Sequence, residues 1–292
     1  MLSSRLYWPA RRFGALESPY SDLDSARFVV IPVPYDSTTT WRAGTREGAM
    51  AIIQASINME LYDREFGREI YQAGIHTTAE VEPDMSGPEG MANRVQEVIA
   101  EVFEARKVPV MLGGEHSLTL GGVRALAARA NSLTVVQLDA HTDLRDSYSG
   151  TQFGHGCVMR RASEIPGVRI IQVGLRSSSQ EEIDAVPANV TQFWAEDLLA
   201  DFPGQLRRIV ELIEGDVYLT FDVDCCDPSW MPDTGTPEPG GLSYYEIRDV
   251  LRAVCRTGRV RAVDCLELIG GHPASAFAVA RLLYKTMGYL SE

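Results

Sequence analysis

The feature that most constrains the fold is a regular alternation of short β-branched runs with stretches of helical periodicity along almost the whole chain. Such alternation predicts a parallel β-sheet with helices on both faces. The expected strands, about eight in number, are Phe28–Val33, Ile75–Val81, Val108–Leu112, Leu133–Leu138, Val168–Val173, Val190–Phe193, Val217–Val223 and Val260–Leu268. The clearest expected helices are Glu47–Leu61, Asn93–Lys107, Leu118–Ala130, Ser243–Arg256 and Pro273–Met287. Because no linker, repeat or low-complexity segment interrupts this pattern, we expect one α/β domain over residues 1–292.

Charge and hydropathy exclude several classes of protein. The net charge of −13 and the pI near 4.9 argue against a general binder of nucleic acid or anionic membrane, and weakly favour cationic ligands. No apolar run approaches the roughly 18–20 residues that span a bilayer. The first 14 residues contain no continuous apolar segment typical of a secretory signal. Five cysteines without a CxxC pair indicate reduced thiols in a cytoplasmic protein, and we expect Cys225 and Cys226 to be packing residues.

Three expected strands end in residue types that bind metals. In an extended chain, residues two apart point to the same side, so alternate residues after a strand can converge. The segments are Gly113–Ser117, Asp139–Asp143 and Thr220–Asp224, and in parallel α/β sheets ligands bind at this carboxyl edge. Together they supply two imidazoles and four carboxylates, from His116, Asp139, His141, Asp143, Asp222 and Asp224. Taken alone, the pair Asp139 and His141 fits a polar turn equally well.

The combined set of side chains predicts a dinuclear metal site. Four unpaired carboxylates in one crevice would be very costly to bury, whereas two divalent cations would balance their charge. Six ligands are too many for one zinc ion. An oxygen-rich set with two imidazoles and no thiolate favours Mn²⁺ over structural zinc.

Two further residues are candidates for the chemistry. His155 lies in a glycine-rich loop, Phe153–Gly156, shortly after the Asp139 group, although an isolated loop histidine is more often a surface residue. Glu267 lies at the end of the last expected strand, where a cationic ligand or a nearby arginine would supply the partner that its charge needs.

These motifs, taken in order, resemble the ureohydrolases, the arginase and agmatinase family of dimanganese hydrolases. The resemblance rests on GGEHS, DAHTD and TFDVDCCDPSWMPDTGTPEPGGL, and on the opening IPVPYDSTTTWRAGTREGAMAI, so it covers nearly the whole chain. It implies a three-layer α/β/α domain with an eight-stranded parallel sheet, and homotrimers or homohexamers.

The resemblance also implies roles for individual residues. One manganese ion would bind His116, Asp139, Asp143 and Asp222, and the other would bind Asp139, His141, Asp222 and Asp224. His155 matches the histidine assigned to proton shuttling. Glu267 matches the glutamate that holds the guanidinium group of the substrate.

The sequence departs from the family pattern in three places. Glu115 stands where an aspartate is common, and Ala49-Met50 replaces a usual Gly-Pro. Leu268–Pro273 replaces an Asn/Ser-Pro-containing run close to the expected site.

The segment after the Asp139 group bears on the substrate. It reads Leu144-Arg145-Asp146-Ser147-Tyr148, as in many bacterial and archaeal agmatinases, and lacks the Asn-x-Pro signature of arginine-specific relatives. We therefore expect hydrolysis of agmatine to putrescine and urea, a step of polyamine biosynthesis. Aminopropylagmatine, guanidinobutyrate and arginine are the alternative substrates. We further expect Arg145 to face a protein carboxylate, such as Asp146 or another acid.

Two alternatives come from other classes. Dinuclear metallophosphoesterases also use an Asp-x-His motif, but their GNH-type motif is absent from this sequence. A catalytically inactive, metal-binding regulatory relative normally lacks a ligand, whereas all six are present here.

Overall fold

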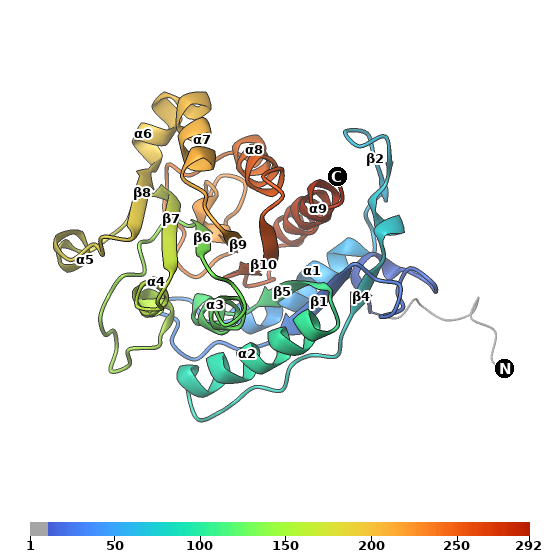
Figure 1. The fold of residues 1–292 in the computed structure, drawn as a ribbon, viewed down its shortest axis with the longest axis horizontal. Helices are drawn as coiled ribbons and strands as arrows, with labels where there is room; N and C mark the ends of the chain where they lie inside the picture. The colour runs from blue at the N-terminus through green and yellow to red at the C-terminus, as the bar shows by residue number, and fades with distance from the viewer. Residues whose placement is uncertain (1–10) are drawn as a thin grey trace.

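The core of the molecule is one parallel β-sheet of eight strands, seen in a computed structural model that describes residues 11–292 (Figure 1). From one edge to the other the strands are β4 (Ile75–Thr77), β1 (Phe28–Val33), β5 (Val108–Gly113), β10 (Val260–Leu266), β9 (Asp216–Asp222), β6 (Leu133–Leu138), β7 (Val168–Leu175) and β8 (Val190–Trp194). All neighbours in this sheet pair in parallel. Each expected strand is therefore confirmed, with ends shifted by a few residues.

Helices cover both faces of the sheet. The helices are α1 (Gly48–Ser56), α2 (Pro88–Glu104), α3 (Thr119–Ala127), α4 (Val158–Ser163), α5 (Gln180–Asp184), α6 (Ala195–Ala200), α7 (Phe202–Glu211), α8 (Tyr244–Cys255) and α9 (Pro273–Tyr289). Helices α2, α3 and α4 pack side by side on one face, whereas α6, α7, α8, α9 and α1 form the other layer (Figure 1). The three-layer α/β/α class is confirmed.

The central strands are buried because their sequences are almost continuously apolar. All six residues of β1 and all six of β6 are buried, as expected of parallel strands that are covered on both faces. Gln137 is a polar residue within this apolar strand, and it is fully buried. Its Nε2 donates to Asp139 Oδ2 at 2.6 Å, so even this residue is directed toward the end of the strand.

Some boundaries differ from the expectation for local reasons. Ser243 and Glu246 form a capping box at the start of α8, which begins one residue after the start of the expected helix. Helix α1 ends at Ser56, five residues before the expected end, where the Ser56 hydroxyl bonds the Ile53 carbonyl and accepts the Gly14 N–H. A short hairpin that the sequence did not indicate, β2 (Tyr62–Asp63) with β3 (Arg68–Glu69), follows.

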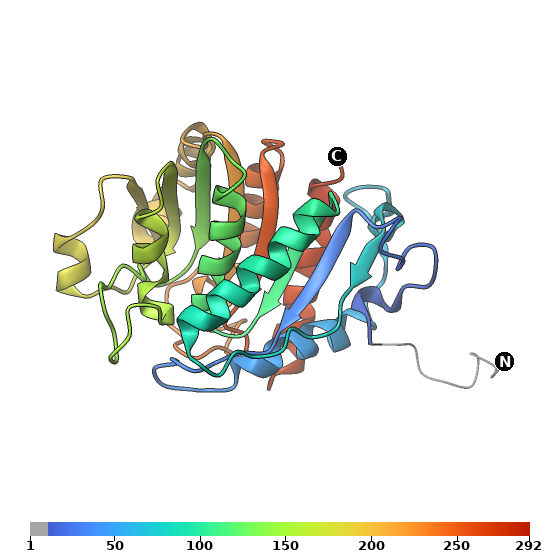
Figure 2. The same ribbon diagram turned by 60° about the horizontal axis from the view of Figure 1, so that its bottom comes forward.

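The strands end at a common edge, where the segments of interest begin. Figure 2 shows the strand arrows pointing the same way, toward one edge of the sheet. In the part of the chain that the structure describes, no helix is both long enough and apolar enough to cross a bilayer. Residues 1–10, which carry most of the segment expected to lack a secretory signal, lie outside the described residues.

Candidate metal centre

Four adjacent strands in the middle of the sheet deliver the candidate site residues. In spatial order these strands are β5, β10, β9 and β6, and each carries site residues at or just after its carboxyl end. His116 follows β5, Glu267 follows β10, Asp222 closes β9, and Asp139 follows β6. Residues that are 23 to 151 positions apart therefore meet at one edge, because parallel strands point their carboxyl ends the same way.

The first group of side chains is centred on His116. Its Nδ1 lies 3.0 Å from Asp139 Oδ2, 3.0 Å from Asp143 Oδ2 and 3.2 Å from Asp222 Oδ2. This nitrogen is buried and has no hydrogen bond of good geometry, although three carboxylate oxygens surround it. One nitrogen and several oxygens converging in this way fit a divalent cation better than a hydrogen-bonded pair.

The second group of side chains shares Asp139 with the first. His141 Nδ1 lies 2.9 Å from Asp224 Oδ2 and 3.6 Å from Asp139 Oδ1. Asp139 thus turns one oxygen toward each histidine. His116, Asp139 and Asp222 have ligand atoms close enough to hold one ion, and Asp139, His141 and Asp224 have them close enough to hold another. The second oxygen of Asp222 accepts the Asp224 N–H at 2.8 Å.

The residues converge by a route that the strand pattern did not predict. Strand β6 ends at Leu138, so Asp139, His141 and Asp143 lie beyond it, and Asp143 has a left-handed φ of 52°. Strand β9 ends at Asp222, and Asp224 lies in a 3₁₀ turn, η7 (Val223–Cys225). The expectation that these residues share a face through the two-residue period of a strand is therefore wrong. Loop geometry brings them together instead.

Burial and mutual charge shift the pKa values of these groups in opposite directions. Burial opposes ionisation of Asp139, yet contacts with His116 and His141 outweigh it and hold the pKa of Asp139 below its usual range. Burial and the Asp139 charge raise the pKa of Asp143 to about 7. Burial and the Asp224 charge raise the pKa of Asp222 well above its usual value. Such opposed shifts within one cleft are typical of a functional site.

The two imidazoles hold protons strongly. Burial lowers the pKa of His141, but the nearby carboxylates, Asp224 foremost, outweigh burial and raise it to about 12. Contacts with Asp139, Asp143 and Asp222 likewise raise the pKa of His116 well above its usual value, against the effect of burial. A cation that replaced these protons would meet the same carboxylates, which is the electrostatic requirement of a metal site.

The ligand side chains are oriented by partners that the sequence did not identify. His116 Nε2 lies 3.0 Å from the Thr220 hydroxyl on β9, which leaves Nδ1 facing the carboxylates. Hydrogen bonds of this kind fix the orientation of a metal-binding imidazole. Thr220 could have been noticed as a polar residue in an apolar run, but nothing local links it to a histidine 104 positions earlier.

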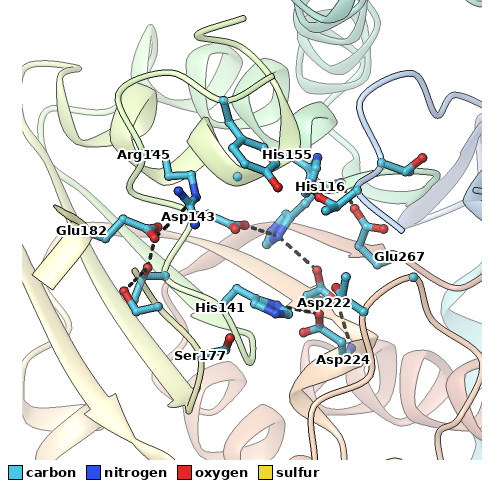
Figure 3. Close-up of a pocket in the computed structure, with 18 of the residues that line it drawn as sticks. His116, His141, Asp143, Arg145, His155, Ser177, Glu182, Asp222, Asp224 and Glu267 are labelled. Carbon is cyan, nitrogen blue, oxygen red and sulfur yellow. Dashed lines mark hydrogen bonds and ion pairs between the residues drawn. The ribbon is translucent and has the colours of Figure 1, made fainter. Parts of the chain in front are cut away.

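Glu267 and His155 line the same cavity of about 210 Å³ as the histidine–aspartate groups (Figure 3). Glu267 is buried, and its Oε1 accepts the His116 N–H at 2.6 Å. Burial, followed by the charge of Glu115, raises the pKa of Glu267 well above its usual value. Its backbone φ of 65° is unusual for a residue other than glycine. Among the described residues, no arginine forms a salt bridge with Glu267.

His155 is held between two hydroxyls. Its Nδ1 lies 3.1 Å from Thr38 Oγ1, and its Nε2 lies 2.8 Å from Thr40 Oγ1. The rings of His155 and Tyr148 form a T-shaped pair, with ring centroids 6.0 Å apart. Burial lowers the pKa of His155, and the charge of Glu115 acts in the opposite direction. His155 is therefore a cavity residue, and the surface alternative is wrong.

The far side of the cavity carries an ion pair. Arg145 Nε lies 3.7 Å from Glu182 Oε2, and its guanidinium lies over the Tyr148 ring, 4.7 Å from the centroid (Figure 3). Arg145 therefore faces a carboxylate, as expected, but Asp146 is not that partner, since Asp146 pairs with Arg161 at 2.6 Å. Glu182 was missed because it is the last residue of a capping box at α5, a pattern that indicates only a helix start.

The five cysteines are buried and free. Cys225 and Cys226 lie beside the second group, with sulfur atoms 4.0 Å apart. Burial raises the pKa of Cys225 well above its usual value, so this thiol is a poor nucleophile and a poor metal ligand. The structure agrees with a packing role for the pair.

The chain belongs to the arginase family, whose family model matches residues 26–288. It is 39% identical over 278 residues to the N(1)-aminopropylagmatine ureohydrolase of Synechocystis sp., covering 91% of this chain and 90% of that one. It is 34% identical over 278 residues to the agmatinase of Pyrococcus horikoshii, covering 94% and 95%. The crystal structure of the agmatine ureohydrolase of Thermoplasma volcanium superposes with a TM-score of 0.89 at 28% identity, covering 98% and 96%. The expected family is confirmed, and the protein is a ureohydrolase.

Proposed function

We propose that the site holds two Mn²⁺ ions and hydrolyses the guanidinium group of a substrate that also carries an amine, such as agmatine or N1-aminopropylagmatine. The observation that carries this proposal is the arrangement of two histidine–aspartate groups around the shared Asp139. The proposed ligands of the first ion are His116, Asp139, Asp143 and Asp222. Those of the second are Asp139, His141, Asp222 and Asp224.

The donor set supports manganese over zinc. Four carboxylates and two imidazoles form a hard, oxygen-rich set, and the buried Cys225 and Cys226 lie outside it. When bound, the two ions would lower the pKa of a water molecule and stabilise negative charge that develops on the substrate.

Glu267 and His155 are the proposed catalytic residues. The guanidinium group is a planar cation, and the free oxygen of Glu267 would accept its N–H groups while Oε1 stays bonded to the His116 backbone. This contact would orient the central carbon toward the metal side of the cavity. The reaction adds water to that carbon, breaks one C–N bond and transfers a proton to the departing nitrogen, giving urea and an amine. His155 would supply that proton.

The substrate that we propose lacks a carboxylate. Within the cavity Arg145 is already paired with Glu182, so a substrate carboxylate would have to compete with a protein acid for it. Agmatine satisfies this requirement, and so does N1-aminopropylagmatine, which is longer. The name of the 39% identical relative favours the longer substrate.

A second observation supports a long substrate. A cavity of about 270 Å³, lined mainly by hydroxyl groups, adjoins the metal cavity and shares Thr39, Thr40 and Tyr148 with it. Hydroxyl oxygens can accept hydrogen bonds from an ammonium group. An aminopropyl extension could therefore continue into this space.

The decisive experiment measures urea release by the Mn²⁺-loaded protein. Agmatine, N1-aminopropylagmatine, guanidinobutyrate and arginine are compared at one pH, with Asp139→Asn as the control that lacks the shared ligand. We expect kcat/KM for the two carboxylate-free substrates to exceed that for arginine by roughly a hundredfold, since an unpartnered buried carboxylate costs a few kcal/mol. Equal or reversed values would make the protein an arginase in activity. Tight Mn²⁺ binding without urea from any of the four would favour an inactive, metal-binding relative.

Two coarser features complete the proposal. We propose a homotrimer or homohexamer, as the family resemblance implies, to be checked by light scattering. We also propose a cytoplasmic location, which the five free thiols support.

A further inference from the structure

Glu115, the residue that departs from the common aspartate, is a fully buried carboxylate with four hydrogen-bond donors around it. Its Oε2 accepts the backbone N–H groups of Ser37 and Thr38, both at 2.6 Å. Its Oε1 accepts the hydroxyls of Ser117, at 2.6 Å, and of Thr38, at 2.8 Å. An ionised carboxylate can only accept hydrogen bonds, so the Thr38 hydroxyl proton is directed toward Glu115.

The Thr38 hydroxyl also contacts His155 twice. Its oxygen accepts the His155 backbone N–H at 3.0 Å and lies 3.1 Å from the ring Nδ1. A hydroxyl has one proton and two acceptor lone pairs. With the proton given to Glu115 and one lone pair occupied by the backbone N–H, only an acceptor site remains for the ring. Nδ1 must then carry the proton of the neutral imidazole.

The other ring nitrogen is the one on the metal side. Nε2 contacts Thr40, which lines both the metal cavity and the adjoining cavity of about 270 Å³, whereas Thr38 lines only the adjoining cavity. With Nδ1 protonated, Nε2 of the neutral ring accepts the Thr40 hydroxyl proton, and Nε2 of the charged ring carries the exchangeable proton. Burial lowers the pKa of His155, and the charge of Glu115 opposes this effect.

Gly154 allows the close approach of Thr38 and the His155 loop. A Cβ atom at position 154 would lie 3.2 Å from both the Thr38 hydroxyl and the Thr151 methyl group. Glu115, Thr38 and His155 come from three distant segments of the chain, so their alignment is a property of the fold.

We propose that Glu115 and Thr38 form a hydrogen-bonded relay that fixes the His155 tautomer, so that Nε2 is the atom that exchanges a proton with the substrate. Thr38 and Glu115 are positioning residues, because they act through His155. The catalytic part of this inference rests on the role of His155 in the proposed function, while the tautomer itself does not. In serine proteases a carboxylate fixes the tautomer of the catalytic histidine by a direct hydrogen bond to Nδ1–H, whereas here the Thr38 hydroxyl lies between the two groups.

The most informative variant is Glu115→Gln. The amide oxygen has to face the Ser37 and Thr38 N–H groups, so the amide NH₂ takes the position that faces the Thr38 hydroxyl. Thr38 must then accept from Gln and donate its own proton to Nδ1. The substitution keeps the shape of the relay, reverses its direction and moves the His155 proton to Nε2.

Two further variants separate the relay from general stability. Thr38→Val removes the hydroxyl with little change of side-chain shape, whereas Thr38→Ser keeps the hydroxyl. Thr78→Val is the matched control, since Thr78 is also half-buried and its hydroxyl donates to the Ala79 carbonyl.

The tautomer is read by ¹⁵N NMR of the His155 ring in protein loaded with diamagnetic Zn²⁺, with His155→Gln used for assignment. We expect Nδ1–H in the wild type and in Thr38→Ser, and Nε2–H in Glu115→Gln. An Nε2–H ring in the wild type, or an unchanged ring in both Glu115→Gln and Thr38→Val, would overturn the relay.

The second test measures the steady-state kinetics of urea release by the Mn²⁺-loaded protein. We expect Glu115→Gln and Thr38→Val to lower kcat about tenfold to a hundredfold with KM and Mn²⁺ content little changed, because the lost effect is part of general acid catalysis. Thr38→Ser should recover most of kcat. A loss of kcat that follows a loss of manganese, without recovery in Thr38→Ser, would show a structural role and contradict the proposal. If the wild type releases no urea, the proposed function fails, and the NMR result still decides whether the relay exists.

Discussion

The carboxylate of Glu267 is tied to the backbone of His116: its Oε1 accepts the His116 N–H at 2.6 Å. The link is reinforced by a second bond between the same two strand ends, from the Glu267 N–H to the Gly114 carbonyl at 2.8 Å. The proposed guanidinium anchor and a proposed metal ligand therefore share one rigid unit. A displacement of β10 relative to β5 would therefore disturb the positions of Glu267 and His116 together.

Replacing Glu267 by Gln should weaken both substrate binding and turnover while the metals stay bound. The amide keeps the shape of the side chain but removes the negative charge that faces the guanidinium group. We expect kcat/KM to fall at least a hundredfold, equivalent to about 2.7 kcal/mol. Metal analysis and steady-state kinetics check this, with the exposed Glu196→Gln as the control. Loss of manganese in Glu267→Gln would mean that Glu267 is needed for metal binding.

Chelation should lower the thermal stability of the protein. Binding two ions to the folded chain stabilises it by mass action, by about 2.7 kcal/mol per site at a concentration one hundred times Kd. We expect about two Mn²⁺ per chain and a lower Tm after treatment with EDTA. Asp139→Asn should show little of this response, because Asp139 faces both histidines. A single ion per active chain, or activity with zinc alone, would refute the dinuclear manganese site.

The affinity for Mn²⁺ should increase with pH. The surrounding carboxylates raise the pKa of His116 well above its usual value and that of His141 to about 12, so both rings hold protons at neutral pH. A ligand nitrogen has to be unprotonated, so binding releases protons, and competition from protons weakens as pH rises. Below about pH 7, protonation of Asp143 weakens binding further. Calorimetric titration at about pH 6.5 and 8.5, in buffers with different ionisation enthalpies, measures both effects. An affinity that is independent of pH, with no proton release, would contradict the assignment of these histidines.

The double variant Cys225→Ala/Cys226→Ala should keep most of the activity, with or without reductant. Both thiols are buried, and the raised pKa of Cys225 disfavours the reactive thiolate. A small fall in Tm is expected because buried volume is lost. Redox-dependent activity in the wild type that disappears in the double variant would instead assign the pair a regulatory role.

The six histidine and aspartate residues could be predicted from the sequence because they directly follow recognisable strands. Parallel strands place their carboxyl ends at one edge, so the position of Asp139 after β6 and of Asp222 at the end of β9 was sufficient to bring them together. The strand period did not supply the local geometry. The turn at Asp143 and the 3₁₀ helix at Asp224 depend on contacts between loops, which have no local sequence signature.

The supporting residues could not be predicted for a related reason. Glu115 and Thr38 are 77 positions apart, and their hydrogen bond depends on how the loop after β1 packs against the loop after β5. Thr38 lies in a run of three threonines whose sequence suggests only a polar loop. The partner of Arg145 was predicted as an acid, but choosing Glu182 over the adjacent Asp146 required the position of α5 beside the cavity.

The order of the central strands, β5-β10-β9-β6, has a consequence for how such a protein can change. The proposed ion-binding side chains and Glu267 lie at or just after the ends of adjacent strands, which the sheet holds in register. Arg145, Tyr148 and Glu182, which line the cavity, lie in segments that connect strands of the sheet. A lineage, or an engineer, can therefore rewrite those segments and exchange one guanidino compound for another while the reactive centre is inherited intact. Substitutions in the connecting segments can therefore change substrate selectivity without changing the residues at the strand ends.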